Sequence, residues 1–249
     1  MTHEQNQANP ASAPTSEVIA APAKDMSALY TPIAIIVAGA LVGGSLYFAL
    51  SPKRAAVGGA PTGPVAVDVK DVNIKNLPYI GKEKASLTMA YWSDYQCPYC
   101  KQFEVQVLPT LVKDYVDTGK LKIVFMDFAF LGPDSTVAAH YKHAVWELYP
   151  DKFFKWNEAM YKAQDQEHGG FGNEASILKL IAGIGGMDAS KLKARVASKA
   201  AEYDAIMAAG QAEGAKVGVT GTPGFVIGEQ IIGGAQPLPN FIAAIEAQL

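Results

Sequence analysis

The stretch SDYQCPYCKQF, residues 93–103, contains both cysteines of the 249-residue chain. Two residues separate Cys97 from Cys100, and a helix-compatible sequence starts at the second cysteine. Such a pair can be a structural staple, half of a metal site, or a redox pair. A disulfide between them would close so small a loop that it adds little stability through chain entropy. The staple is therefore the weakest of the three interpretations.

The segments on either side of the cysteine pair predict a strand–helix–strand unit. The apolar run 86–92 suits a central strand, and 121–128 returns to strand character. Between them, apolar residues recur at helical spacing from Cys97 to about Thr118, with a kink expected at Pro109 and an end at Gly119. We expect the two strands to be parallel and joined by a right-handed crossover.

The rest of the C-terminal part continues this α/β pattern. Alternating residues predict a half-buried strand at 65–72, and helix follows helix from about 133 to 218. Two short apolar runs in 224–234 predict a β-hairpin, and 238–249 predicts a terminal amphipathic helix.

The N-terminal part has a different composition. Residues 1–28 contain few large apolar side chains and are predicted to be a disordered tail. Residues 29–51 include an uncharged apolar run that is long enough to cross a bilayer as a helix, so we expect a membrane anchor in contact with lipid through 30–50. A Pro/Gly/Ala linker is expected at 52–64, before a domain at 65–249.

The charge of the chain excludes some partners and leaves the orientation of the anchor open. The net charge is −3 and no basic cluster appears, so we expect no binding to nucleic acid. Lys53 and Arg54 after the apolar run outnumber Lys24 before it, which weakly favours a cytoplasmic C-terminal domain. Large domains cross membranes largely regardless of such charges.

The CPYC sequence has the features of a reactive thiol pair. If Cys97 caps a helix and Pro98 takes its first position, the free N–H groups of the first turn point at the Cys97 sulfur. The helix dipole supplies about 0.3–2 kcal/mol, which lowers the pKa of the thiol by about one unit or less. Direct N–H···S bonds would lower it further. Cys100, one turn later, should face inward and resolve a mixed disulfide formed at Cys97.

A zinc site would need two more ligands. His140 and His143 lie on one predicted helix, so a set of two cysteines and two histidines is conceivable. Their spacing is one residue shorter than usual, however, and the loop between the cysteines and the histidines is far longer than in a zinc finger. We therefore predict no metal ligands and no cofactor.

At this point the chain resembles the DsbA family of thiol–disulfide oxidoreductases over residues 75–249. The resemblance rests on the stretch 93–103, on GVTGTPGFVIG at 218–228, and on a helical insert of about 133–218 between them. It implies a thioredoxin-like fold with a long helical insertion. It also implies that Thr222 and Pro223 form a cis-proline loop that lies against the active-site cysteines and binds substrate.

The sequence departs from the family at one position. Many members carry an acidic residue six places before the first cysteine, where it helps to move the proton of the buried thiol; here that place is Tyr91. Asp94 is nearer, but its expected role in the loop is capping or solvation. Proton transfer from Cys100 should then depend on water or on another carboxylate.

The resemblance implies a membrane-anchored oxidoreductase on the outer side of the cell membrane. Its expected partners are exported proteins with cysteine pairs and a membrane-bound, quinone-linked protein that reoxidises it. Two alternatives stay open: a disulfide reductase or isomerase of the same fold, and a non-catalytic zinc-stapled or chaperone-like binding domain. The expected site residues are the catalytic Cys97 and Cys100, the redox-tuning Pro98 and Tyr99, and the substrate-binding Thr222 and Pro223.

Overall fold

The computed structural model describes residues 67–167 and 169–249. The predicted tail, membrane helix and linker lie outside these residues and stay predictions. Within the described part of the chain, no helix combines the length and the apolar character that a membrane span requires.

A five-stranded sheet forms the centre of the domain, in the order β1-β3-β2-β4-β5. The predicted strand–helix–strand unit is confirmed, because β2 (Leu87–Ser93) and β3 (Leu121–Asp127) pair in parallel. The predicted hairpin is also present: β4 (Gly224–Ile227) pairs antiparallel with β2 on one side and with β5 (Gln230–Gly233) on the other.

The helix after the cysteines is interrupted where the sequence predicts a kink. Helix α2 (Pro98–Gln106) ends at Val107, and α3 (Leu108–Leu111) with the π-helical turn Val112–Val116 continues the segment. Pro109 has no N–H to donate to the preceding turn, so the helix breaks just before it. Gly119 then adopts a positive φ of 79°, which ends the segment as expected.

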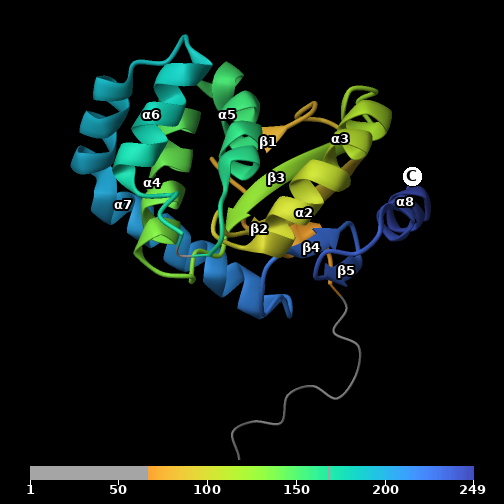
Figure 1. The fold of residues 1–249 in the computed structure, drawn as a ribbon. Helices are drawn as coiled ribbons and strands as arrows, with labels where there is room; N and C mark the ends of the chain where they lie inside the picture. The colour runs from red at the N-terminus through yellow and green to blue at the C-terminus, as the bar shows by residue number, and fades with distance from the viewer. Residues whose placement is uncertain (1–66, 168) are drawn as a thin grey trace, which may run out of the picture. The chain divides into compact units, whose positions relative to one another are not determined.

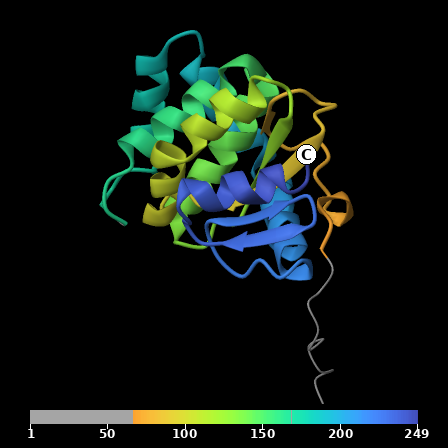
Figure 2. The same ribbon diagram turned by 90° about the vertical axis from the view of Figure 1, so that its right-hand side faces the viewer.

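The predicted run of helices packs together beside the sheet (Figure 1). It consists of α4 (Pro133–Leu148), α5 (Pro150–Ala163), α6 (Glu174–Ile184) and the long α7 (Ala189–Lys216). The last helix, α8 (Leu238–Glu246), lies next to β4 and β5 (Figure 2). It packs on the same face of the sheet as α2, because Phe241 contacts Phe103 and Phe225. The fold is therefore thioredoxin-like with a helical insertion.

Both faces of the sheet are buried, and neighbouring positions of a strand serve different cores. On β2, Met89 and Tyr91 face the larger core, which contains Phe103 of α2 and Phe241 of α8. Residues Ala90 and Trp92 face a smaller core, which contains valines from the segment before β1 and from the segment between α7 and β4. The alternation follows from the two-residue repeat of a strand. Those valines are Val67, Val69, Val72, Val217 and Val219.

The strand predicted at 65–72 is wrong for the residues that the structure describes. Val69–Asp71 form a 3₁₀ turn, because the Asp68 side chain accepts a hydrogen bond from the Lys70 N–H at 2.9 Å and caps the turn. The short edge strand β1 (Tyr79–Ile80), which pairs with β3, was not predicted. Two residues are too few to show a strand pattern in the sequence.

A buried ionic network attaches the helical insertion to the end of β3. The Asp127 carboxylate lies 2.5 Å from Lys142 Nζ and 2.8 Å from His143 Nε2, both on α4. All three side chains are almost completely buried. Burial alone would raise the pKa of Asp127, but Lys142 and His143 hold it well below its usual range.

A second connection joins the same end of the sheet to α7. The indole N–H of Trp92 donates to the Gly210 carbonyl oxygen at 2.8 Å. A Cβ on Gly210 would lie 2.9 Å from the Asp127 carbonyl oxygen, so only glycine allows this close approach.

Candidate active site

The cysteine pair lies where β2 passes into α2, as the sequence predicts. Cys97 is the N-cap residue and Pro98 occupies the first helical position. Proline suits that place because the first helical N–H has no partner within the helix. Both sulfur-bearing residues are buried, whereas Pro98 and Tyr99 between them are exposed, Tyr99 with 62% of its surface.

Asp94 organises the loop that leads to Cys97. One carboxylate oxygen accepts from the Gln96 N–H at 2.8 Å and from Ser135 Oγ at 2.7 Å. The other accepts from the N–H groups of Phe130 and Leu131 at 2.9 and 3.1 Å. The expected capping role is confirmed, but solvation is not its role, since the side chain is 1% exposed. Asp94 joins the cysteine loop to the segment that follows β3.

Gln164, at the end of α5, holds the cysteine loop from the other side. Its side-chain amide donates to the carbonyl oxygens of Tyr95 at 2.6 Å and Cys97 at 3.1 Å. The helical insertion therefore fixes the backbone on both sides of the reactive sulfur. The sequence carried no signal for this residue, because its role exists only once α5 packs on α2.

The structure brings the two predicted motifs together. The Thr222–Pro223 peptide bond is cis, as the family resemblance implied. The Cys97 thiol donates to the Thr222 carbonyl oxygen across 3.5 Å. Pro223 is buried and Thr222 is half-buried, so the loop covers the sulfur of Cys97.

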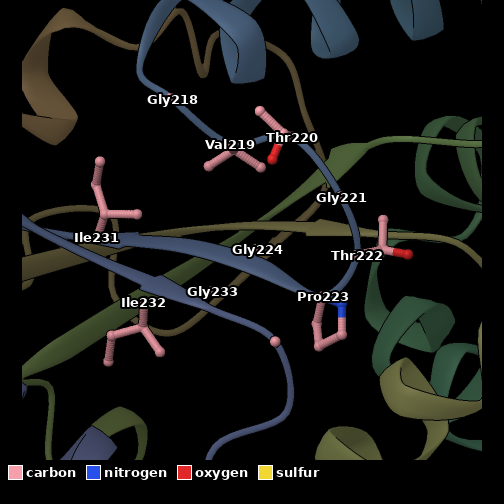
Figure 3. Close-up of a pocket in the computed structure, with 11 residues that line it drawn as sticks. Gly218, Val219, Thr220, Gly221, Thr222, Pro223, Gly224, Ile231, Ile232 and Gly233 are labelled. Carbon is pink, nitrogen blue, oxygen red and sulfur yellow. The ribbon is translucent and has the colours of Figure 1, made fainter. Parts of the chain in front are cut away.

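A pocket of about 220 Å³ lies beside this loop (Figure 3). The backbone from Gly218 to Gly224 forms one wall, and Ile231 and Ile232 of β5 form the other. Five of the residues around it are glycines, which leaves main-chain groups accessible near the cis-proline.

Hydrogen bonding strongly favours the ionised form of Cys97. The pKa of Cys97 is lowered to about 6, chiefly because the Cys100 thiol hydrogen-bonds to its sulfur. Burial acts against this, while the Thr222 side chain and the N–H groups of Cys100 and Tyr99 lower the pKa further. Those N–H groups make no capping bond of standard geometry to the sulfur. The neighbouring thiol therefore matters more than the helix N-terminus that the sequence suggested.

Cys100 has the opposite character. It is completely inaccessible, and burial raises its pKa well above the usual range, as does its hydrogen bond to Cys97. A nucleophilic thiolate beside a protonated, shielded thiol is the arrangement that two-step disulfide exchange requires.

The two histidines considered as zinc ligands have other partners. His140 Nε2 lies 2.8 Å from Asp204 Oδ1, and His143 Nε2 lies 2.8 Å from Asp127 Oδ2. Among the residues that the structure describes, no group of three or more potential ligands is placed to hold a metal ion. The structure therefore does not assemble the two cysteines and two histidines into one site.

The sequence reasoning missed a buried carboxyl group close to the cysteines. Glu104 lies on α2, one turn after Cys100, and is 2% exposed. Its pKa is raised to about 8 because it is buried, although the Asn157 amide, which donates to it at 3.0 Å, and Tyr91 counteract the shift. Four residues of separation on a helix place its side chain on the same face as Cys100.

Comparison with known proteins identifies the family of this domain. A family model described as thioredoxin matches residues 74–247. Disulfide bond formation protein D of Bacillus subtilis (strain 168) is 36% identical over 92 residues, which are 37% of this chain and 41% of that protein. The probable disulfide bond formation protein D of Bacillus anthracis is 29% identical over 102 residues, 41% of this chain and 47% of that protein. The chain thus spans less than half of these curated relatives.

Solved structures share the fold over a larger part of the chain. Oxidised BdbD from Bacillus subtilis superposes with a TM-score of 0.66 at 24% identity. The superposition covers 74% of this chain and 97% of the BdbD chain. The thiol-disulfide exchange protein alpha-DsbA2 from Wolbachia pipientis gives a TM-score of 0.62 at 26% identity, with 72% and 91% covered.

Proposed function

The chain belongs to the thioredoxin family, and on this premise we propose that it is a membrane-anchored thiol–disulfide oxidoreductase that introduces disulfides into exported proteins. The observation that carries the proposal is the asymmetry of the cysteine pair. Cys97 has a pKa of about 6 and lies against the Thr222 carbonyl, while Cys100 is inaccessible and protonated. Similarity to proteins named disulfide bond formation protein D supports the direction of the reaction.

The substrate dithiol and the two cysteines account for all the electrons and protons of the exchange. In the oxidised protein, a substrate thiolate attacks Cys97 Sγ, the Cys97–Cys100 bond breaks, and Cys100 leaves with the electron pair and takes up a proton. The second substrate thiolate then attacks the substrate sulfur of the mixed disulfide, and Cys97 leaves as a thiolate. Two electrons pass from the substrate dithiol to the cysteine pair. The low pKa of Cys97 makes this last step favourable, since a stable thiolate is a good leaving group.

Thr222 and Pro223 are proposed to hold the substrate backbone during this exchange. The loop is beside the reactive sulfur, and the adjacent pocket exposes glycine-rich main chain that an extended peptide can pair with. Pro98 and Tyr99 are proposed to tune the potential, because they set the geometry of the first helical turn. The exposed Tyr99 side chain also lies where a bound substrate would meet the protein.

The direction of electron flow is the first point to test. Pairs with the C-x-x-C spacing span about 150 mV, so the same site can oxidise or reduce. A titration of the pair against glutathione should give a potential far less reducing than that of thioredoxin. A value near about −270 mV would favour the alternative, a reductase or isomerase.

Activity itself is tested with reduced peptide dithiols. The wild-type protein should oxidise them, and Cys97→Ser should lose the activity. A chaperone-like binding domain would keep all of its function in that variant. A zinc-stapled domain would show bound zinc and no reactive thiols after reduction.

We place the domain outside the cytoplasmic membrane, with the anchor at 29–51 in the bilayer, and we propose a quinone-linked membrane protein as its reoxidising partner. This placement rests on the family resemblance and on the apolar run at Tyr30–Leu50. A membrane-impermeant maleimide, added to intact cells after mild reduction, should label Cys97. Labelling only after lysis would place the domain inside and favour a reductase.

A further inference from the structure

A cluster of buried polar groups surrounds Cys100 on the inner side of α2. Glu104 shares its helix face, the Tyr91 ring comes from β2, and the Tyr161 ring comes from α5. All four side chains are at most 2% exposed. Tyr91 and Tyr161 each interact electrostatically with both Cys100 and Glu104, so the four groups lie in one pocket of the core.

The hydrogen bonds of this cluster are incomplete. One oxygen of Glu104 accepts from Asn157 Nδ2 at 3.0 Å, and Asn157 in turn accepts from the Tyr95 hydroxyl at 2.7 Å. The other oxygen of Glu104 and the hydroxyls of Tyr91 and Tyr161 have no hydrogen-bond partner of standard geometry among the described residues. The Tyr91 hydroxyl is nevertheless close enough to Glu104 to lower the pKa of that carboxyl.

A buried carboxyl oxygen without a partner among the described side chains is costly, so its presence calls for an explanation. An exposed glutamate would serve α2 equally well as a helix former. Glu104 is instead buried and held by Asn157, and its pKa is raised to about 8. A buried acid with a pKa near the working pH is well suited to exchange protons with a neighbouring group.

We propose that Glu104 exchanges the proton of Cys100 during disulfide exchange. The inference rests on the proposed function and adds a further residue to its machinery. The Tyr91 hydroxyl, which interacts with both groups, positions the carboxyl and offers a hydroxyl path between them.

The proton balances in both directions of the reaction. When a substrate thiolate attacks Cys97, the departing Cys100 thiolate takes the proton of neutral Glu104, which becomes a carboxylate. When the disulfide forms again from a mixed disulfide, the carboxylate takes the proton from the Cys100 thiol. The resulting thiolate attacks Cys97 Sγ and expels the other thiolate.

Other titratable groups face this pocket, and their titration has to be distinguished from that of Glu104. Tyr91, Tyr95 and Tyr161 have pKa values raised far above neutrality by burial. The charge of the partly exposed Glu158 on α5 contributes to the raised pKa of Glu104. The charge of Asp127 at the end of β3 contributes to the raised pKa of Tyr95. Asp127 stays ionised near neutral pH beside Lys142. Glu104, with a pKa of about 8, and Cys97, with a pKa of about 6, both titrate between pH 5 and 9.

The experiment follows the reduced full-length protein mixed with an aromatic disulfide whose thiolate product absorbs visible light. The first phase reports attack by Cys97, and the second reports release of the product by Cys100. In the wild type the second phase should speed up with rising pH and level off above about pH 8. Glu104→Gln should slow it at pH 7 by at least about tenfold and leave the first phase unchanged. Its rate should then keep rising with pH, because hydroxide has to remove the proton.

The control variant is Glu158→Gln, which removes a neighbouring carboxylate that pairs with Lys162. It should change the second phase by less than about twofold, and Glu104→Asp should restore part of the lost rate. If Glu104→Gln does not fold, Asn157→Ser tests the same idea, since loss of the amide should move the levelling-off to higher pH.

The outcomes separate this inference from the proposed function. A second phase with the same rate and pH profile in wild type and Glu104→Gln would overturn the role of Glu104 while leaving the oxidoreductase intact. A wild-type protein with no second phase at any pH would instead overturn the proposed function.

Discussion

The Cys97 sulfur lies 3.5 Å from the carbonyl oxygen of Thr222, which is 125 positions further along the chain. The contact exists because β2 and β4 are neighbours in the sheet, with Trp92 opposite Gly224. The loop before β4 therefore lies at the same end of the sheet as the cysteine loop that follows β2. The same pair of strands therefore holds the Cys97 sulfur and the cis-proline loop in place.

Cys97 should titrate near pH 6 in the reduced protein, as measured by the ultraviolet absorbance of its thiolate. Cys100→Ala should move the midpoint upward toward that of an ordinary thiol, because the variant lacks the S–H group that bonds to the sulfur. Gln102→Ala, on the exposed side of α2, is the matched control and should leave the midpoint where it is. An unchanged midpoint in Cys100→Ala would assign the shift to the helix N-terminus instead.

Glu104 should make the oxidised protein less stable at high pH. Its pKa is about 8 in the folded state against about 4.5 when unfolded, so the folded state binds more protons between these values. The contribution of Glu104 to stability is therefore greatest below about pH 4.5 and falls as the pH rises toward 8. Glu104→Gln should match the wild type at pH 5 and exceed it at pH 9 by on the order of 3 kcal/mol. Urea unfolding of both proteins at each pH measures the difference. A gap that does not grow with pH would mean that the carboxyl ionises freely in the folded state.

Asp127→Asn should cost about 3–5 kcal/mol of unfolding free energy at pH 7, because buried Lys142 loses its carboxylate partner. The matched control is Glu202→Gln, which breaks a surface pair with Lys199 and should cost less than about 1 kcal/mol. Denaturant unfolding curves provide both values. Equal losses in the two variants would show that the buried network does not hold the insertion to the sheet.

Two glycine-to-alanine changes should have opposite effects on stability. Gly210→Ala places a methyl group 2.9 Å from the Asp127 carbonyl oxygen and should destabilise the protein by about 1–3 kcal/mol. Gly183→Ala, on α6, meets nothing within 4 Å and should stabilise by up to about 1 kcal/mol, because alanine favours a helix. Thermal unfolding of both variants tests the pair. Stabilisation by Gly210→Ala would mean that α7 lies further from β3 than described.

The sequence by itself was sufficient for the features that depend on neighbouring residues. Apolar periodicity located β2, β3 and the helices of the insertion, and Pro109 marked the break in the helix after the cysteines. The N-cap position of Cys97 follows from the proline beside it. These patterns are local because hydrogen bonds within a helix and alternation along a strand involve residues close in sequence. The 3₁₀ turn at Val69–Asp71 was missed because one capping side chain, Asp68, outweighed a strand-like pattern.

Only the tertiary structure decided the chemical environment of the two sulfurs. Asp94 and Gln164 look like ordinary loop residues in the sequence. Once the insertion packs beside the cysteine loop, Asp94 accepts from Ser135 of α4 and Gln164 donates to the Tyr95 carbonyl oxygen. Glu104 looks like a surface residue of an amphipathic helix and is buried because α5 covers that face of α2. A pKa depends on burial and on partners distant in the chain, so it arises only when the folded chain brings them together.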